Sequence, residues 1–326
     1  MRYSAILVTL FCLVGSRLPT DARGQENNWG KWGANDQIGT LNYITPETIR
    51  GAARLVRQGK VISLGTPVGP EGPCGTGAYG KIYRYMISTA QGRGQEAGFA
   101  EDHLFTEVHG NSHWDGIAHM YAHGTIYNGY DAEASVTWKG ALKNGIQEVS
   151  NKVVGRGVLV DVARYKGVRI LPGDCLITPD DMDGAARQQG VVFRQGDFLL
   201  IHTCWLLTWY EKGKDALWNS GSPGIGWEVS QWLKKVRAAA VAMDARNVEF
   251  MPCEKEAARK VGLPDWQLPI HVELLRNQGM MIGDLFDLRE LAADCANDGI
   301  YEFMFVGPPL NILYGTGSPV NPVAIK

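Results

Sequence analysis

Five of the seven histidines in this chain lie within twenty-one residues, at positions 103, 109, 113, 119 and 123. The densest part reads His109-Gly-Asn-Ser-His113-Trp-Asp115-Gly-Ile-Ala-His119. In an extended backbone, residues two apart point to the same side, so His113 and Asp115 can reach one point. His109 and His119 can join them only through bends, which the glycines after His109 and Asp115 permit. The segment is therefore expected to be extended in its middle and bent on either side.

These residue types in this spacing are typical of a metal site. Imidazole and carboxylate together are ligands that zinc, manganese and iron accept. An isolated His-x-Asp recurs by chance, whereas His-x3-His-x-Asp-x3-His is much more specific. A metal ion with three or four protein ligands and one open position lowers the pKa of a bound water to about 7. An imidazole nearby that does not bind the metal is suited to act as general acid or base. The alternative is a hydrogen-bonded structural cluster.

A further histidine and a further acid occur much later, between Leu268 and Asp284. His271 follows a proline and precedes two leucines, which predicts a helix that begins beside a pocket. For a single histidine on such an element, a capping or core role is the ordinary one. Asp284 is equally suited to be the N-cap of a helix predicted over residues 285–295. The residues alone assign neither side chain to the site.

The N-terminus is typical of a secretory signal peptide. Arg2 precedes an apolar run, residues 5–14, that is too short to span a bilayer, and Thr20-Asp21-Ala22 resembles a cleavage site. We therefore expect residues 1–22 to be a cleaved signal peptide and residues 23–326 to form the mature domain. The protein is then secreted or periplasmic. An uncleaved membrane anchor is the alternative.

Composition argues against two classes of partner. The chain is 45% hydrophobic and 20% charged, with a formal net charge of −2, which is ordinary for a globular protein. Neither nucleic acid nor, after signal cleavage, a membrane is expected to bind it. Five cysteines remain in the mature chain without CxxC spacing, so no disulfide framework is expected, although one bridge is permitted. Cys175 and Cys204 lie in apolar, strand-like runs and are expected to be buried apolar residues rather than reactive thiols.

Helix and strand patterns are mixed along the whole mature chain. Thr-Pro-acid signatures at residues 45–47 and 178–180 predict the beginnings of two helices. Apolar, β-branched runs predict strands at 158–162, 191–192, 198–201, 238–243 and 301–306. Further helices are predicted over 227–236 and 285–295. This mixture predicts one α/β or α+β domain.

On these motifs, the chain resembles the cyclase family of metal-dependent hydrolases, which includes bacterial kynurenine formamidase, isatin hydrolase and the trans-dienelactone hydrolases. The family motif is His-x-Gly-Thr-His-x-Asp-x-Pro-x-His, and residues 109–119 match its three histidines and its aspartate. Similarity continues through residues 29–42, 157–164, 196–205, 222–226, 241–244, 269–288 and 317–326, nearly all of the mature chain. The resemblance implies a single compact α/β domain, with a β/β/α arrangement around a central mixed sheet, assembled as a homodimer or homotetramer.

The resemblance also implies a role for each matching residue. The implied ligands of a divalent metal ion are His109, His113 and Asp115. The implied general acid/base is His119. A second metal position, or the far wall of the site, would be completed by His271 and Asp284. Zinc and manganese are the expected ions, although these ligand types also accept iron.

Three positions depart from the family motif. Asn111-Ser112 replaces Gly-Thr, which keeps a hydroxyl but changes the turn. Ile117 replaces proline, so that loop is less constrained. Asp284 stands where a glutamate is usual and is one methylene shorter. We therefore expect one firmly bound ion and an uncertain second.

The function predicted is metal-dependent hydrolysis of an amide, lactam, ester or lactone in a small, cyclic or aromatic substrate. His119 would take a proton from water and return it to the leaving group. Trp114, between the ligand pair, is expected to face away from the metal. Trp29, Trp32 and Tyr121 are candidate walls for a flat substrate, although each is equally a packing residue.

Two other functions compete with hydrolysis. His113-x-Asp115 with the distant His271 is also the pattern of the two-histidine, one-carboxylate site of non-haem iron oxygenases. That interpretation leaves His109 and His119 unexplained. The other alternative is a secreted metal-binding protein without turnover.

Overall fold

The central element of the structure is a curled mixed sheet. The computed structural model describes residues 26–74, 82–91, 94, 97–218, 221–264 and 268–326, so the expected signal peptide lies outside the described residues. Within these residues nine strands pair in the following order: β1 (Val61–Ser63), β15 (Val323–Ile325), β13 (Glu302–Val306), β7 (Val154–Asp161), β9 (Phe198–His202), β11 (Ala240–Met243), β12 (Met281–Asp284), β4 (His113–Asp115) and β14 (Gly317–Pro319).

The middle of this sheet is parallel and buried on both faces. Strands β7, β9, β11 and β12 run parallel, whereas the strands on both sides of them are antiparallel. Every residue of β9, β11 and β12 is buried, as expected for parallel strands that are covered on both faces. The carboxyl ends of the four parallel strands therefore meet at one edge. That edge bears polar side chains, Asp161, His202, Asp244 and Asp284.

The sequence located four of these nine strands as apolar runs. The predicted strands at 158–162, 198–201, 238–243 and 301–306 correspond to β7, β9, β11 and β13. The predicted strand at Val191–Val192 is wrong, because these two residues lie in the connection before β9, and the Val192 side chain is exposed. A two-residue apolar run is too short to distinguish a buried strand from an exposed connection.

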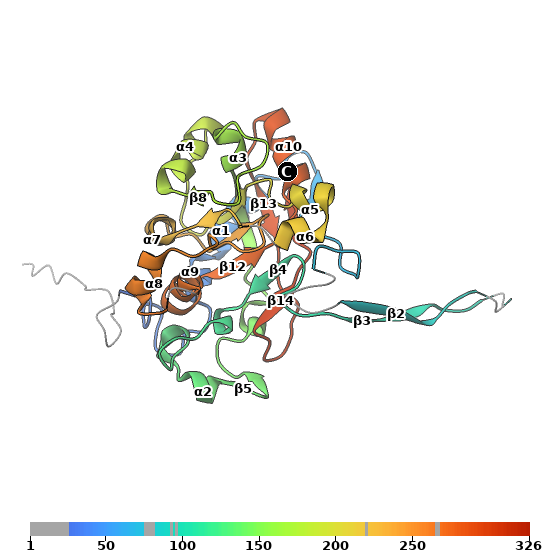
Figure 1. Cartoon of the computed structure of the whole chain (residues 1–326), viewed down its shortest axis with the longest axis horizontal. Coiled ribbons are helices and arrows are strands. Elements are labelled where there is room, and N and C mark those ends of the chain that lie inside the picture. The colour runs from blue at the N-terminus through green and yellow to red at the C-terminus, as the bar shows by residue number, and fades with distance from the viewer. Residues whose placement is uncertain (1–25, 75–81, 92–93, 95–96, 219–220, 265–267) are drawn as a thin grey trace, which may run out of the picture.

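Helices flank the sheet (Figure 1). They are α1 (Pro46–Ala53), α2 (Ala132–Ser135), α3 (Val162–Tyr165), α4 (Pro179–Gln189), α5 (Leu207–Lys212), α6 (Lys214–Trp218), α7 (Trp227–Val236), α8 (Lys255–Val261), α9 (Pro269–His271) and α10 (Arg289–Asp298). Short 3-10 turns are η1 (Gly39–Tyr43), η2 (Ile117–His119), η3 (Tyr127–Gly129) and η4 (Ile146–Val149), and η5 (Val272–Gln278) is a π-helix.

The predicted helix beginnings are confirmed, with one exception. Thr45 and Thr178 each form a capping box, with the proline at the first helical position. Helix α7 matches its predicted range. The helix predicted from residue 285 begins later, because Leu285 has a φ of +57° and the chain enters α10 only after Leu288. Asp284 is therefore not its N-cap.

In the described part of the chain, three small two-stranded sheets accompany the central sheet. Strands β10 (Gly224–Ile225) and β8 (Leu176–Ile177) pair in parallel, and β5 (Val136–Thr137) pairs antiparallel with β6 (Gly140–Ala141). The third, β2 (Tyr83–Ser88) with β3 (Glu101–Phe105), projects from the body as a long arm (Figure 1). The predicted single α/β domain around a central mixed sheet is confirmed.

Two remaining expectations concern membranes and cysteines. No helix in the described ranges has the length and apolar character needed to cross a bilayer. Among the described residues, no disulfide joins the cysteines at 74, 175, 204, 253 and 295. Cys175 and Cys204 are only partly buried, so the expectation that both are buried apolar residues is wrong. Cys204 lies in the turn after β9, where its φ is +59°, a backbone conformation that an apolar strand pattern cannot reveal.

Candidate metal centre

Strand β4 positions the centre of the site, because its residues alternate between two environments. Trp114 is fully buried and packs edge-on against Phe286, with ring centroids 5.1 Å apart. Its indole Nε1–H donates a hydrogen bond to the carbonyl oxygen of Gly307 at 2.7 Å. The tryptophan thus anchors the strand in the core and faces away from the site. His113 and Asp115 consequently share the opposite side of the strand.

The Asp115 carboxylate is the point on which the other side chains converge. Its Oδ1 lies 3.3 Å from Nε2 of His113 and 3.7 Å from Nε2 of His109. Its Oδ2 lies 3.7 Å from Nε2 of His271. A ligand-type atom of His119 lies within 4.8 Å of those of His109 and Asp115. The structure therefore brings together the whole 109–119 motif and the distant histidine.

Asp284 joins this cluster from the neighbouring strand. It ends β12 and is the register partner of His113, so the two side chains lie on the same side of the sheet. Its Oδ1 accepts a hydrogen bond from the backbone N–H of Val248 at 2.8 Å. Its Oδ2 lies 3.7 Å from Nε2 of His113. Although its side chain is short, Asp284 forms a second group of three ligand-type residues together with His113 and Asp115.

Two imidazoles are held through Nδ1, which leaves Nε2 free for a ligand role. His113 Nδ1 lies 2.8 Å from the carbonyl oxygen of Asn111, an acceptor, so Nδ1 carries the proton. His271 Nδ1 lies 2.7 Å from Oε2 of Glu249, which also accepts from the backbone N–H of His271 at 3.1 Å. An oriented imidazole whose other nitrogen donates to an acceptor is the usual arrangement around a protein-bound metal ion.

Glu249 is the site residue that the sequence did not reveal. It is buried, it is twenty-two residues from His271, and no spacing rule connects the two. Burial alone would lower the pKa of His271, but the hydrogen bond and charge of Glu249 outweigh it and raise that pKa to about 9. No signal in the sequence marks Glu249, because its burial and its contact with His271 appear only in the tertiary structure.

His109 completes the centre because Gly317 leaves room for it. Gly317 lies in β14 opposite Asp115, and a Cβ atom there would lie 2.4 Å from Nε2 of His109. That nitrogen is buried, and among the described residues it has no hydrogen-bond partner. The ring lies beside that of His119, with centroids 4.0 Å apart. His109 and His119 are only partly buried, so the cluster reaches solvent on their side.

The residues present fit a divalent ion. A tetrahedral ion with ligands at about 2.1 Å separates neighbouring ligand atoms by about 3.4 Å. The separations here are 3.3–3.7 Å, which suits shared coordination better than direct hydrogen bonding. The buried Nε2 of His109 without a partner supports the same conclusion. The donor set is imidazole and carboxylate, as borderline divalent cations prefer.

The protonation of the cluster also suits a cation. Burial lowers the pKa of His109 to about 4, so this imidazole is neutral. Burial opposes ionisation of Asp115 as well, but its imidazole neighbours outweigh that effect and its pKa lies below the usual range. The pKa of Asp284 is raised to about 7, mainly by burial and additionally by the negative charge of Asp115. Against the effect of burial, the neighbouring acids raise the pKa of His113, and that of His271 to about 9, so the carboxylates favour positive charge at this point of the structure.

The departures from the family motif are accommodated locally. Asn111 takes a φ of +55°, which turns the chain into β4. The Ser112 hydroxyl accepts from the backbone N–H of Thr66 at 2.8 Å and donates to the carbonyl oxygen of Leu285 at 2.6 Å. Ile117 begins η2, where it is buried in the core. The turn therefore stays fixed without the usual glycine and proline.

Several other aromatic and histidine side chains are held elsewhere. The Trp29 ring packs under the guanidinium of Arg276, 4.7 Å from its centroid, and Trp32 packs edge-on against Tyr43. Tyr121 is 64% exposed, two residues after the motif. Their role as substrate walls stays a prediction. The remaining motif-region histidines lie outside the cluster, His103 on the exposed arm and His123 hydrogen-bonded to the carbonyl oxygen of Val261.

The fold and the histidine–aspartate centre together define a class of protein. A family model described as putative cyclase matches residues 37–249. A solved structure described as a novel cyclase is 37% identical, with a TM-score of 0.82, and the match covers 92% of this chain and 97% of that one. The chain belongs to the cyclase family.

More distant solved structures share the fold. Isatin hydrolase A from Labrenzia aggregata is 18% identical with a TM-score of 0.60, and the match covers 84% of this chain and 94% of that one. Isatin hydrolase A from Ralstonia solanacearum is 18% identical with a TM-score of 0.58, covering 86% and 95%. No curated protein matches the chain.

Proposed function

We propose that this protein is a metal-dependent hydrolase that cleaves an amide or ester bond, cyclic ones included, in a small substrate. The observation that carries the proposal is the convergence of imidazole and carboxylate groups around Asp115, with Nε2 of His113 and His109 at 3.3 and 3.7 Å from its Oδ1. Family membership supports the proposal, and two solved structures with this fold are named isatin hydrolases.

The proposed division of labour follows the geometry. His109, His113 and Asp115 hold one divalent ion, zinc or manganese, and His271 with Asp284 closes the far wall or holds a second ion. When bound, such an ion polarises a carbonyl group and makes water more acidic. Burial lowers the pKa of His119. This imidazole is neutral at physiological pH and can accept a proton from water and deliver it to the leaving nitrogen or oxygen.

Hydrolysis is tested with the purified protein, its metal content and a substrate panel. The panel contains lactones, aryl esters, formamides and cyclic imides, each assayed with and without a chelator. The proposal expects a bound divalent ion and hydrolysis that the chelator abolishes and the ion restores. Stoichiometric metal without hydrolysis of any member would instead favour a metal-binding protein. Turnover that requires oxygen and a 2-oxo acid would favour the oxygenase alternative.

The role of His119 is tested by the substitution His119→Ala. Metal content is expected to persist while the rate falls by about 10²–10⁴-fold, the usual loss of a general acid or base. Because His119 is close enough to His109 and Asp115 to be a ligand itself, metal content is the decisive measurement. Loss of the ion would show that His119 is a ligand, and unchanged turnover would show that it has no role. His123→Ala, an exposed histidine outside the cluster, is the matched control.

We also propose that the protein is a homodimer or homotetramer that uses the arm. On one face of the arm, Tyr83 lies opposite Phe105 and Tyr85 lies opposite His103. The two tyrosines and the phenylalanine are 51–70% exposed. A two-stranded hairpin has little stability by itself, and an aromatic face of this kind is typical of an interface core. A second copy of the chain is the proposed partner.

The proposal for location rests on the sequence alone. Residues 1–22 act as a signal peptide, and the mature protein is secreted or periplasmic. N-terminal sequencing of the exported protein is expected to begin at Arg23.

A further inference from the structure

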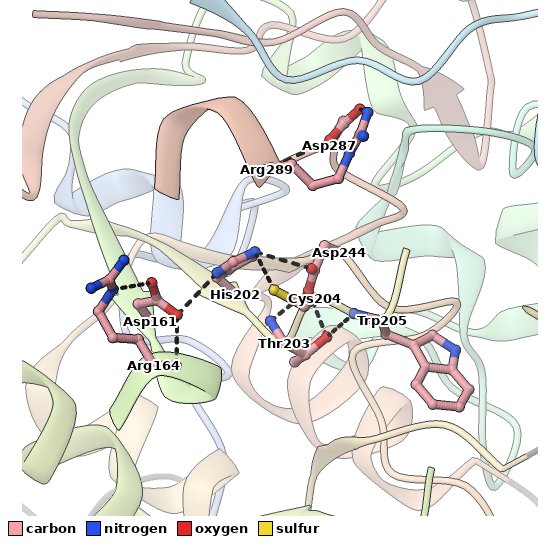
Figure 2. Close-up of polar contacts among 9 residues, drawn as sticks. All are labelled: Asp161, Arg164, His202, Thr203, Cys204, Trp205, Asp244, Asp287 and Arg289. Carbon is pink, nitrogen blue, oxygen red and sulfur yellow. Dashed lines mark hydrogen bonds and ion pairs between the residues drawn. The ribbon is translucent and has the colours of Figure 1, made fainter. Parts of the chain in front are cut away.

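A second cluster of reactive side chains lies at the same edge of the sheet, away from the metal centre. Asp161 ends β7 and His202 ends β9, and the two residues are register partners. Asp244 follows β11, the next strand. Figure 2 shows these side chains around the imidazole of His202, with Cys204 beside it. The proposed hydrolytic mechanism uses none of these groups.

The contacts of His202 form a chain from an acid through a base to a thiol. Its Nδ1 lies 3.0 Å from Oδ1 of Asp161, and its Nε2 lies 3.2 Å from Sγ of Cys204 (Figure 2). Asp244 Oδ2 lies 3.7 Å from the same Nε2. A carboxylate on one ring nitrogen and a nucleophile on the other is the geometry of an activated nucleophile.

The backbone presents the thiol in an unusual way. Cys204 has a φ of +59° and lies between the end of β9 and the beginning of α5. Glycine adopts this conformation without strain, whereas cysteine does not. The turn is held by Thr203, whose hydroxyl accepts from the N–H of Trp205 at 3.1 Å and donates to Asp244 Oδ1 at 2.6 Å. A strained position between a strand and a helix exposes a nucleophile at the sheet edge.

The thiol is accessible from a cavity. Cys204 is partly exposed, and a cavity of about 550 Å³ is lined by Asp161, Arg164, His202, Cys204 and Arg289, among others. This volume lies within the range of small-molecule sites. The Nε–H of Arg289 donates a hydrogen bond to Oδ1 of Asp287 at 2.9 Å. The Nε of Arg164 lies 3.5 Å from Oδ2 of Asp161. The cavity is therefore lined by two arginines and by the imidazole and the thiol of this cluster.

The charges around His202 favour its cationic form. Burial would lower the pKa of His202, but the hydrogen bond to Asp161, the charge of Asp244 and the contact with Cys204 raise it well above its usual value. Burial also opposes ionisation of Asp161, but its hydrogen bond to His202 outweighs burial and lowers its pKa. The groups that face this imidazole are thus two acids and the thiol. A protonated imidazole nitrogen thus lies within 3.2 Å of Sγ of Cys204.

We propose that Cys204, His202 and Asp161 form a second catalytic site that hydrolyses small activated acyl esters through a covalent thioester. The Cys204 thiolate attacks the ester carbonyl carbon, a C–S bond forms and the C–O bond to the alcohol breaks. His202 Nε2–H gives its proton to the leaving oxygen, and the alcohol departs. Water then loses a proton to His202 and adds to the thioester carbon, the C–S bond breaks to release the acid, and the thiolate–imidazolium pair is regenerated.

The first experiment measures thiol reactivity in the full protein. Iodoacetamide is added at neutral pH, and each cysteine is followed by peptide mass mapping. Cys204 is expected to react at least about tenfold faster than Cys175, which is also partly exposed but whose thiol pKa is raised by burial. His202→Asn is expected to abolish this advantage, and Asp161→Asn to reduce it. Equal rates for Cys204 and Cys175 would overturn the proposal.

The second experiment tests acyl transfer with p-nitrophenyl acetate. The expected result is a burst of nitrophenol, an acetyl adduct on Cys204 and a slower steady release. Cys204→Gly removes the thiol and also relieves the backbone strain, so the adduct should vanish while the melting temperature stays equal or rises. An adduct on another residue, or alkylation of Cys204 without any acetyl adduct, would contradict the acyl-transfer proposal.

The metal centre provides the matched control. Acetylation of Cys204 is expected to persist in His119→Ala and in the presence of a chelator, conditions that the proposed hydrolase activity does not survive. Conversely, Cys204→Gly is expected to leave chelator-sensitive hydrolysis intact. The two activities therefore fail independently. Loss of the adduct on metal removal would show that the thiol belongs to the metal centre and would overturn a separate site.

Discussion

The substitution Gly317→Ala tests whether the metal centre depends on space rather than only on ligands. A Cβ at this position would lie 2.4 Å from Nε2 of His109 and 2.8 Å from the carbonyl oxygen of Trp114. Ordinary contacts of a Cβ atom begin near 3.4 Å, so the His109 ring must retreat by about 1 Å. Displacement of a reacting group by about 1 Å can reduce the rate about 10²-fold.

We expect Gly317→Ala to weaken metal binding and to lower hydrolysis about 10²-fold, with a smaller effect on folding. Overpacking of this kind costs about 1–3 kcal/mol, which thermal unfolding would register as a modest fall in melting temperature. Metal affinity is measured by titration of the chelator-treated protein, and the rate is measured with excess metal. Gly51→Ala is the matched control, because a Cβ at Gly51 meets nothing within 4 Å.

A double substitution separates the two contacts of the new methyl group. If it acts through the His109 ring, His109→Ala combined with Gly317→Ala should be no less active than His109→Ala alone. Full metal affinity and rate in Gly317→Ala would refute the reasoning. Additive losses in the double variant would refute the route through His109 and point to the Trp114 carbonyl oxygen instead.

Three further predictions concern other parts of the molecule. Glu249→Gln, which weakens the acceptor at its histidine partner, should lower metal affinity about 10–100-fold with little change in melting temperature; unchanged affinity would remove Glu249 from the site. Burial opposes ionisation of Asp181, but its ion pair and capping contacts outweigh burial and lower its pKa from 3.8. Its stabilising contribution is therefore present above that value and lost as the pH falls. Asp181→Asn should flatten the acid side of the stability profile, and exposed Asp180→Asn should not. Tyr85→Lys, on the aromatic face of the arm, should reduce the oligomer mass seen by light scattering, whereas Leu104→Lys on the opposite face should not; equal masses would exclude the arm as the interface.

Local patterns predicted a large part of the fold. The capping boxes at Thr45 and Thr178 need only neighbouring residues, so both helices were located from the sequence. The central strands were visible as buried β-branched runs. The strand β12 was not predicted, and the helix after it was predicted too early, because the positive φ of Leu285 has no signature in an apolar run.

The candidate site divides in the same way. The 109–119 motif could be recognised from the sequence, because in an extended strand the side chains of His113 and Asp115 lie on the same side. Asp284 was ambiguous, and its register pairing with His113 decided its place. Glu249 was missed, because its contact with His271 depends on chain segments far apart in sequence.

The sequence by itself determined the ligand chemistry, the class of fold and the family resemblance, because spacing along one strand and local capping are properties of short segments. Only the tertiary structure decided that Glu249 supports His271, that Gly317 makes room for His109, and that His202 lies between Asp161 and Cys204. The physical reason is that these contacts depend on strand order and register, parallel in the middle of the sheet and antiparallel at β4 and β14. No single segment of the chain encodes that order.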